Sequence, residues 1–166
     1  MSDELCDVLD DEGRVVGVAT RAEVRAGNLW HRTVFVAVVT PAGEIVAHRR
    51  ADWKDIWPSR WDLCFGGLVT AGESWTAAAV RELAEEAGLE VAVDELELLG
   101  EGVFEQEQAR ERTRMFRVAS AGPFSPVDGE VAAIELVPLA ELAAWCEAHD
   151  LVPDTPELLL PLLLVT

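Results

Sequence analysis

The sequence predicts a protein of the α/β class, in its α+β form, with residues 1–166 in one domain. Segments rich in Val, Thr and Phe, which favour strands, alternate with a few segments that have the apolar spacing of helices. A chain of 166 residues, half of them apolar, has the size of one domain with a substantial core. One alanine-rich helix lies between two glycine-containing loops, and the rest of the chain is organised around it.

Turn and capping signals define the elements before that helix. Asp10 to Gly13 is a turn sequence between two strand-like segments, which predicts a hairpin. Thr20 and Glu23 have the spacing of a capping box, so a short helix is expected to begin there and to end at Gly27. A Pro-Ala-Gly turn joins the next two strand-like segments into a second hairpin. The predicted strands are residues 5–9, 14–18, 31–40 and 44–49.

Composition and the positions of Pro and Gly define the remaining elements. Residues 50–62 are charged and rich in Trp, with Pro58 among them, which predicts a structured loop. A three-residue strand at 63–65 then leads into the central loop. After the central helix, the sequence predicts strands at 96–107, 113–119 and 132–137, a loop at 122–129, a helix at 139–149 and a final helical turn or two at 156–163.

The central helix has clear start and stop signals. Ser74 is a good N-cap, residues 75–87 contain five alanines and neither Gly nor Pro, and Gly88 stands where a left-handed stop belongs. A helical wheel separates an apolar face from an acidic one. The predicted buried residues are Ala77, Val80, Leu83, Ala84 and Ala87, and the predicted acidic face holds Glu82, Glu85 and Glu86.

The three glutamates of this face are expected to bind a cation. Residues three and four apart are neighbours on a helix, and like charges there repel by roughly 0.2 to 0.5 kcal/mol per pair. Within the helix only Arg81 is near enough to offset them. Oxygen ligands with several negative charges suit a hard divalent ion, Mg²⁺ before Mn²⁺, better than Zn²⁺. The same acids are also compatible with a solvated acidic face.

Fixed residues recur around this helix at defined spacings. The segment reads Gly67, five residues, Glu73, seven residues, Arg81-Glu82-Leu83, one residue, Glu85-Glu86, one residue, Gly88-Leu89. This pattern resembles the Nudix box at every fixed position, and average residue frequencies give such a match by chance on the order of once in 10⁸ start points. The chain is therefore identified as a member of the Nudix hydrolase superfamily, with its box at residues 67–89.

This resemblance implies an α/β/α sandwich around a mixed sheet, and hydrolysis of a nucleoside diphosphate linked to another group. Carried over by position, the metal ligands would be Glu82, Glu85, Glu86 and the carbonyl group of Gly66. Glu82 would also help to deprotonate water, Arg81 would hold Glu82, and Glu73 would support the loop and the metal site. Carboxylates with Mg²⁺ suit this chemistry, because a catalyst must neutralise charge on the diphosphate and deprotonate water.

Two segments outside the box carry a second resemblance. CDVLDDEG near the N-terminus and HRRADWKDIWPSRWDLCFGG before the box are similar to the Nudix branch related to isopentenyl-diphosphate isomerase, and the similarity covers residues 6–156. The true isomerases place a catalytic Cys immediately before the position of Gly67 and a His at that of Leu68, whereas this chain has Gly66 and Leu68 there. The nearest cysteine, Cys64, lies two residues before the position of the isomerase cysteine. The intact hydrolase acids favour hydrolysis over isomerisation.

Three residues outside the box are candidates for substrate binding or catalysis. Glu130 precedes a predicted strand, in a loop where many members of the superfamily place an additional acid as base or metal ligand. Arg49 and Arg50 end a strand before the box, and alternation sends their side chains to opposite faces, so that one of them can reach a phosphate. An exposed loop acid and surface arginines are the alternatives.

Composition restricts the partners. The formal net charge of −18 argues against non-specific nucleic-acid binding and favours a small-molecule diphosphate as partner. The three cysteines are too widely spaced for a zinc site or a disulfide framework, and the N-terminus has no signal pattern, so a reduced cytoplasm is the expected setting. The apolar C-terminal segment is too short and Pro-interrupted to span a membrane, and is expected to pack as a terminal helix or to mediate a homodimer.

Three functions follow from these observations. The leading hypothesis is a Mg²⁺-dependent hydrolase that cleaves a phosphoanhydride bond of a nucleoside-diphosphate-linked or related diphosphate with metal-activated water. The alternatives are an enzyme like isopentenyl-diphosphate isomerase and a non-catalytic sensor of a nucleotide-like ligand. Three mutually repelling glutamates argue against the sensor, because a binding protein has no need to keep them.

Overall fold

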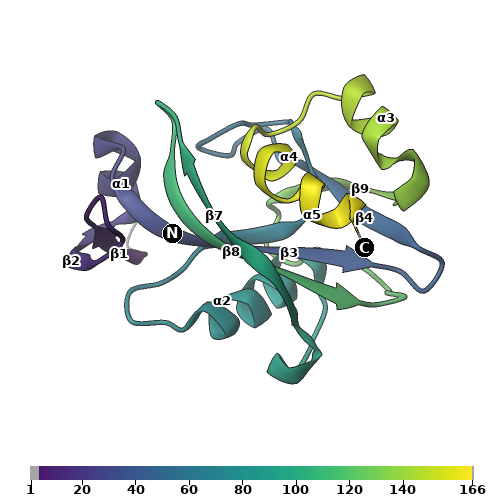
Figure 1. Cartoon of the computed structure of the whole chain (residues 1–166), viewed down its shortest axis with the longest axis horizontal. Helices are drawn as coiled ribbons and strands as arrows, with labels where there is room; N and C mark the ends of the chain where they lie inside the picture. The colour runs from purple at the N-terminus through teal and green to yellow at the C-terminus, as the bar shows by residue number, and fades with distance from the viewer. Residues whose placement is uncertain (1–3, 166) are drawn as a thin grey trace.

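The computed structural model describes residues 4–165 and shows a mixed sheet with helices on both sides (Figure 1). The strands are β1 (Leu5–Leu9), β2 (Val15–Thr20), β3 (Trp30–Val39), β4 (Glu44–Arg50), β5 (Trp61–Asp62), β6 (Phe65–Leu68), β7 (Glu97–Glu105), β8 (Arg110–Ala119) and β9 (Val131–Pro138). The helices are α1 (Arg21–Gly27), α2 (Trp75–Glu82), α3 (Leu142–Ala148), α4 (Asp154–Leu158) and α5 (Leu160–Leu164), with short π- or 3₁₀-helical segments η1 (Leu83–Ala87), η2 (Val93–Glu95) and η3 (Leu139–Glu141).

Strand β3 is the centre of the main sheet. It runs parallel to β8 along its whole length, and β7 lies antiparallel on the other side of β8. Strands β3 and β4 pair at Val39 and Ile45, beside the turn that joins them, and then diverge. Beyond that point β6 pairs with β3, while β5 and β9 pair with β4. The cavity described below takes its residues from both sides of this divergence.

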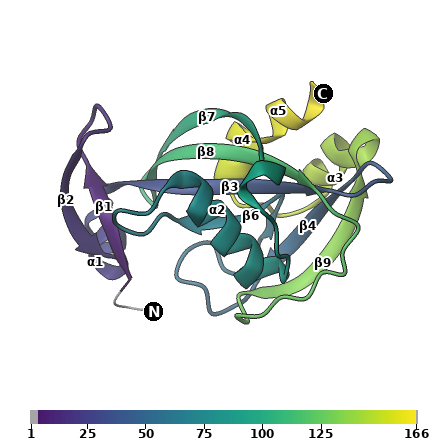
Figure 2. The ribbon, with the colours of Figure 1, turned by 90° about the horizontal axis from the view of Figure 1, so that it is seen from below.

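Apolar side chains cover both faces of the main sheet. Because alternate residues of a strand point to opposite faces, Val36 joins a buried cluster that contains Leu83, whereas Phe35 joins one that contains Leu159 and Leu163. Helix α2 lies on the first face, and α3, α4 and α5 lie on the second (Figures 1 and 2). The predicted α/β/α sandwich with a mixed sheet is confirmed.

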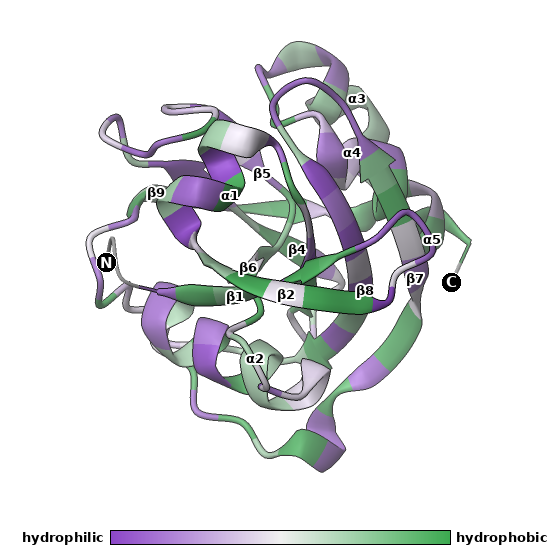
Figure 3. Cartoon of the chain, turned by 90° about the vertical axis from the view of Figure 1, so that its left-hand side faces the viewer, coloured by the Kyte–Doolittle hydropathy of each residue, from purple (hydrophilic) through white to green (hydrophobic). Residues whose placement is uncertain are grey.

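The N-terminal hairpin forms a separate two-stranded sheet at one end of the molecule (Figure 2). Viewed from that end, β1 and β2 lie between α1 and α2 (Figure 3). The guanidinium group of Arg32 fastens this hairpin to the box loop, because it donates to Asp7 Oδ2 at 2.8 Å and to the carbonyl oxygen of Glu73 at 3.1 Å. The hairpin therefore supports the loop that precedes α2.

Most predicted boundaries hold to within two residues, but the strand predicted at residues 113–119 begins three residues earlier, at Arg110. The capping box of Thr20 and Glu23 is present, but the residue in the left-handed conformation after α1 is Asn28, with φ of 45°, and Gly27 is the last helical residue. Asn tolerates this conformation because its short polar side chain can bond locally. The strand predicted at residues 63–65 begins instead at Phe65 and continues to Leu68, because pairing with β3 extends through the glycines.

The apolar C-terminal segment packs as short helices. Leu159 and Leu163 are buried in the core cluster beside α3, so this segment contributes to the core of the protein. None of the helices in residues 4–165 has the length and apolar character needed to cross a membrane.

Candidate active site

Helix α2 and the π-helical segment η1 that continues it carry the box acids. The predicted N-cap is confirmed, since Ser74 Oγ accepts a hydrogen bond from the Ala77 amide at 3.2 Å. The last turn is π-helical and ends at Gly88, whose φ of 67° is the predicted left-handed stop. A Cβ at Gly88 would lie 2.1 Å from the carbonyl oxygen of Ser125, so the loop that passes there requires glycine.

The helical wheel misplaced part of the buried face. Ala77 is exposed and Ala78 and Ala79 are fully buried, while Glu82 and Glu86 are only 6% and 3% exposed. The wheel assumes that acids face solvent, but this side of α2 faces the strand that carries Gly66 and Gly67. The two glutamates are therefore directed into the protein.

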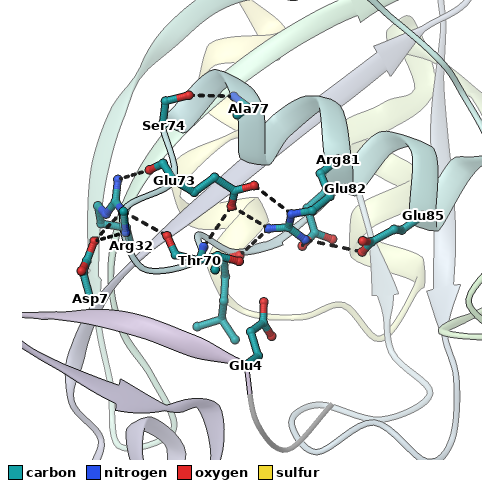
Figure 4. A network of polar contacts seen from close by, with 12 residues as sticks. Glu4, Asp7, Arg32, Thr70, Glu73, Ser74, Ala77, Arg81, Glu82 and Glu85 are labelled. Atoms are coloured by element: carbon teal, nitrogen blue, oxygen red, sulfur yellow. Dashed lines mark hydrogen bonds and ion pairs between the residues drawn. The ribbon is translucent and has the colours of Figure 1, made fainter.

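Arg81 organises the acidic residues around it (Figure 4). Its guanidinium group donates to both carboxylate oxygens of Glu73 at 2.9 Å, to Glu82 Oε1 at 2.9 Å and to the carbonyl oxygen of Leu68 at 3.1 Å. Glu85 Oε2 lies 3.5 Å from Arg81 Nη1. Glu73 in turn accepts from the Thr70 amide at 3.0 Å. The network ties the box loop to the helix and orients Glu82.

Burial dominates the electrostatics of the two inner glutamates. Loss of solvation raises the pKa of Glu82 to about 7, against the opposing effect of Arg81. Burial and the neighbouring Glu82 raise the pKa of Glu86 well above its usual range. Glu86 Oε1 accepts one hydrogen bond, from the Gly66 amide at 2.8 Å. Burial thus favours the neutral form of both carboxylates, and a cation bound beside them would stabilise their charged forms.

Gly66 and Gly67 allow the backbone to approach these acids closely. A Cβ at Gly66 would lie 1.9 Å from the carbonyl oxygen of Val34 on the paired strand. A Cβ at Gly67 would lie 2.8 Å from Glu82 Oε1, in the space that the carboxylate faces. The second glycine therefore leaves room directly beside a box acid.

The donor set fits a hard divalent cation. Glu82, Glu85, Glu86 and the carbonyl group of Gly66 offer oxygen atoms only, which Mg²⁺ and Mn²⁺ prefer. Within residues 4–165, no three His, Cys, Asp or Glu side chains are already gathered as a metal site. Glu85 is the outlying member, since its side chain is 46% exposed and turned toward Arg81.

Two of the box acids, Glu82 and Glu85, line a cavity of about 730 Å³. Of the residues predicted for the site, Gly66, Arg81, Glu82, Glu85, Arg50 and Glu130 line this cavity. Arg50 also donates two hydrogen bonds to the carbonyl oxygen of Ile56, at 3.0 and 3.3 Å. The other predicted residues do not line the cavity: these are Arg49, Glu73 and Glu86. Glu73 accepts a hydrogen bond from Arg81, and Glu86 accepts one from the Gly66 amide.

Glu130 forms an ion pair that the sequence did not suggest. Its Oε1 lies 2.7 Å from Nζ of Lys54, the single lysine of the chain, whose side chain is 6% exposed. Although burial opposes it, hydrogen bonding with Asp128 and Lys54 lowers the pKa of Glu130, and burial together with Glu130 raises that of Asp128 to about 6. A lone lysine in a Trp-rich loop is the signal that could have identified Lys54.

Among the other acids that line the cavity, three come from outside the box and are more than nine-tenths buried, and we call Asp62, Glu111 and Asp154 the inner acidic cluster. They are 8%, 4% and 5% exposed. Glu111 could have been predicted, because it interrupts a strand in which arginines occupy alternate positions on the other face. Asp154 gives no signal of this kind in the sequence, since it lies in a Pro-flanked segment next to the apolar tail.

Arg81→Lys should destabilise the protein, because one ammonium group cannot replace the planar fork that contacts two carboxylates and a carbonyl group. We expect a loss of about 2 kcal/mol of unfolding free energy, and turnover about 10- to 100-fold lower. Thermal unfolding and an activity assay measure both. Arg14→Lys is the control, since Arg14 is exposed. A melting temperature equal to that of the Arg14 variant would contradict the role given to Arg81.

Asp154→Asn should stabilise the protein at alkaline pH. Burial and the charge of Glu111 raise the pKa of Asp154 well above its usual range. The stabilisation that results from this raised pKa is therefore fully present below the unfolded-state pKa of about 3.9. It is lost as the pH rises through the folded-state pKa, where the buried carboxyl group becomes charged. At pH 8 we expect the variant to gain about 1 kcal/mol or more, roughly 3 °C in melting temperature, and the gain should shrink toward pH 4.

The control for this pH series is Asp150→Asn, at an aspartate whose side chain is 83% exposed. Surface substitutions of this kind usually change stability by less than about 0.5 kcal/mol. A pH-independent melting difference between Asp154→Asn and the unsubstituted protein would contradict a raised pKa at Asp154.

Solved structures share this fold. The Deinococcus radiodurans protein DR0079 superposes with a TM-score of 0.77 at 24% identity, over 93% of this chain and 96% of that one. The NUDIX domain of NrtR from Shewanella oneidensis, solved with ADP ribose, superposes with a TM-score of 0.63 at 17% identity, over 87% and 96%. A mixed-sheet sandwich with a box helix beside its cavity thus defines a protein of the Nudix fold.

The sequence comparisons specify the family. The NUDIX domain model matches residues 29–160. A Nudix hydrolase of Streptomyces coelicolor is 37% identical over 154 residues, which is 92% of this chain and 84% of the relative. The Nudix hydrolase YfcD of Escherichia coli is 32% identical over 154 residues, or 93% and 83%. The chain belongs to the NUDIX family and is a Nudix hydrolase.

Proposed function

We propose that this protein hydrolyses a phosphoanhydride bond in a small molecule that contains a diphosphate, with Mg²⁺ as cofactor and Mn²⁺ as a substitute. Glu82, Glu85, Glu86 and the carbonyl group of Gly66 would hold the ion. The observation that carries the proposal is the burial of two neighbouring carboxylates, Glu82 and Glu86, of which only Glu82 is paired with Arg81 while Glu86 accepts a hydrogen bond from the Gly66 amide. Burying such a pair costs stability unless a cation joins it.

The other residues of the site have supporting roles in this proposal. Arg81 orients Glu82 through a 2.9 Å hydrogen bond, and Glu73 fixes Arg81. Glu82 lines the cavity, where it can accept a proton from the attacking water. Arg50 reaches the cavity and can contact a phosphate group, whereas Arg49 lies outside it. Glu130 is held by Lys54 and lines the same cavity, as a second acid near the substrate.

A bound divalent ion would neutralise charge on the diphosphate and lower the pKa of a bound water. The diphosphate itself is resistant to attack because its oxygens are already anionic, so the positive groups of Arg50 and Lys54 assist on the substrate side. ADP ribose in the NUDIX domain of NrtR is a diphosphate-linked molecule, which supports this class of substrate. The single domain, the cytoplasmic setting and a homodimer stay predictions.

The isomerase alternative rests on the resemblance of the segments before the box, and the cysteine in them, Cys64, lines the cavity. Burial and the nearby Asp62 raise the pKa of this thiol well above its usual range, and Gly66 occupies the position of the isomerase cysteine. These features favour hydrolysis. Among residues 4–165, no specific contact favours a ligand sensor over a hydrolase.

A turnover panel tests the proposal. Nucleoside triphosphates, dinucleotides, sugar nucleotides, coenzyme A and isopentenyl diphosphate would be incubated with Mg²⁺, with Mn²⁺ and with chelator, and the products identified by mass spectrometry. We expect metal-dependent cleavage of at least one diphosphate. Conversion of isopentenyl to dimethylallyl diphosphate would indicate the isomerase, and tight binding without turnover would indicate the sensor.

A further inference from the structure

The inner acidic cluster (Asp62, Glu111 and Asp154) lies in the same cavity as the box acids but comes from different elements. Asp62 ends β5, Glu111 lies near the start of β8, and Asp154 begins α4. All three are at least nine-tenths buried and line the cavity. The cavity is therefore lined both by acids of the box and by acids from β5, β8 and α4.

Two buried oxygen atoms beside the cavity have no hydrogen-bond partner among the described residues. Glu111 and Asp154 hydrogen-bond to each other, and Asp62 Oδ1 accepts from the Cys64 amide at 3.3 Å. Glu111 Oε2 is buried and has no hydrogen-bond partner among the described residues. Thr33 is an independent case, because it is 3% exposed, lines the same cavity from β3 and has no partner for its hydroxyl oxygen. Buried polar atoms are normally satisfied, so these atoms indicate a missing donor.

Nearby arginines do not supply that donor. Arg25 lines the cavity and its charge acts on Glu111, but it makes no hydrogen bond to Glu111 Oε2, and its own Nε and Nη1 atoms are buried without a hydrogen-bond partner among residues 4–165. Arg50 directs its guanidinium group to the carbonyl oxygen of Ile56. Neither arginine therefore donates a hydrogen bond to Glu111 Oε2. What the cluster lacks is N–H or O–H groups that reach it from inside the cavity.

We propose that the inner acidic cluster, with Thr33, binds an N–H-donating amino group on the part of the substrate that lies beyond the diphosphate. The inference rests on the proposed function, since it assumes that the box end of the cavity holds the diphosphate. An amino group has several donors and can satisfy Glu111, Thr33 and Asp154 together. An isoprenoid chain would leave these buried oxygens unsatisfied, and sites built for hydrogen bonds reject ligands that lack them.

A matched pair of ligands tests this inference without requiring turnover. The probes are methylene-bridged diphosphonate esters that resist hydrolysis, each ending either in an amino group or in a methyl group of similar size. Linkers of two, three and four carbons cover the unknown distance to the cluster. Calorimetric titration in Mg²⁺ measures their affinities for the full chain.

We expect the best amino ester to bind roughly tenfold or more tightly than its methyl partner, because a hydrogen bond to a charged group is strong once desolvated. In Glu111→Gln and Asp154→Asn this preference should fall to about threefold or less, while the methyl ester binds as before. Glu105→Gln is the control, since Glu105 is exposed and does not line the cavity. It should keep the full preference.

Equal binding of the two esters would overturn the inference and show that water satisfies the cluster. A preference that survives both substitutions would overturn it by showing that the amino group binds elsewhere. Failure of every ester to bind would also overturn it. The turnover panel separates these results from failure of the proposed hydrolysis. Metal-dependent cleavage without a preference for amino groups retains the hydrolase and removes only this subsite.

Discussion

Glu86→Gln is expected to lower turnover by on the order of a thousandfold while leaving the protein folded. The carboxylate is 3% exposed, and its Oε1 accepts from the Gly66 amide, a bond that a glutamine oxygen can also accept. Packing is thus retained, whereas the charge proposed to bind the ion is lost. The metal-free variant should unfold at a higher temperature, because a buried group with a raised pKa is replaced by a neutral one.

Two measurements separate this effect from a general loss of function. Mg²⁺ should raise the melting temperature of the unsubstituted protein, since a ligand that binds only the native state stabilises it, and this rise should be absent in Glu86→Gln. Glu90→Gln is the matched control, as Glu90 is an exposed acid just beyond the same helix. Equal activity of Glu86→Gln and Glu90→Gln would contradict the assignment of Glu86.

Gly66→Ala is expected to cost about 3 kcal/mol or more of unfolding free energy. The added Cβ would lie 1.9 Å from the carbonyl oxygen of Val34 and 2.9 Å from its carbonyl carbon, so β6 has to move away from β3. The obstacle is backbone, which cannot rotate aside. At this chain length the loss corresponds to a fall of about 6 °C or more in the melting temperature.

The neighbouring glycine provides a contrasting variant. At Gly67 the new Cβ would meet the carboxylate of Glu82 at 2.8 Å, which is the mobile end of a side chain. Gly67→Ala should therefore remain nearly as stable as the unsubstituted protein but lose activity, because Glu82 is displaced. Gly17→Ala is the neutral control, with no atom within 4 Å of the added carbon. Greater loss of stability in Gly67→Ala than in Gly66→Ala would contradict this account.

Local signals predicted the elements well, because each depends on residues close in sequence. Ser74 and Gly88 mark both ends of the box helix, and the capping box at Thr20 begins α1. Errors arose where tertiary pairing decides the outcome. The strand beginning at Phe65 extends through two glycines because β3 provides a hydrogen-bonding partner, which propensity at those positions does not reveal.

The candidate site was predictable where spacing along one helix defines it. Glu82, Glu85, Glu86 and Arg81 share that helix, and their proximity follows from its period. Their burial did not follow, because it depends on the strand that α2 faces. Lys54 pairs with Glu130 across 76 positions, and Asp154 joins Glu111 from the C-terminal segment. A single sequence contains no signal for contacts of that range.

The measurement that tests the central claim most directly is turnover in ¹⁸O-labelled water. The best substrate of the panel would be incubated with chelated protein, with protein reloaded with Mg²⁺, and with Glu86→Gln under both conditions. The account predicts one labelled oxygen in a phosphate group of the product, in the reloaded unsubstituted protein alone. Cleavage in chelator, equal cleavage by Glu86→Gln, a product without label, or no cleavage of any diphosphate would contradict it.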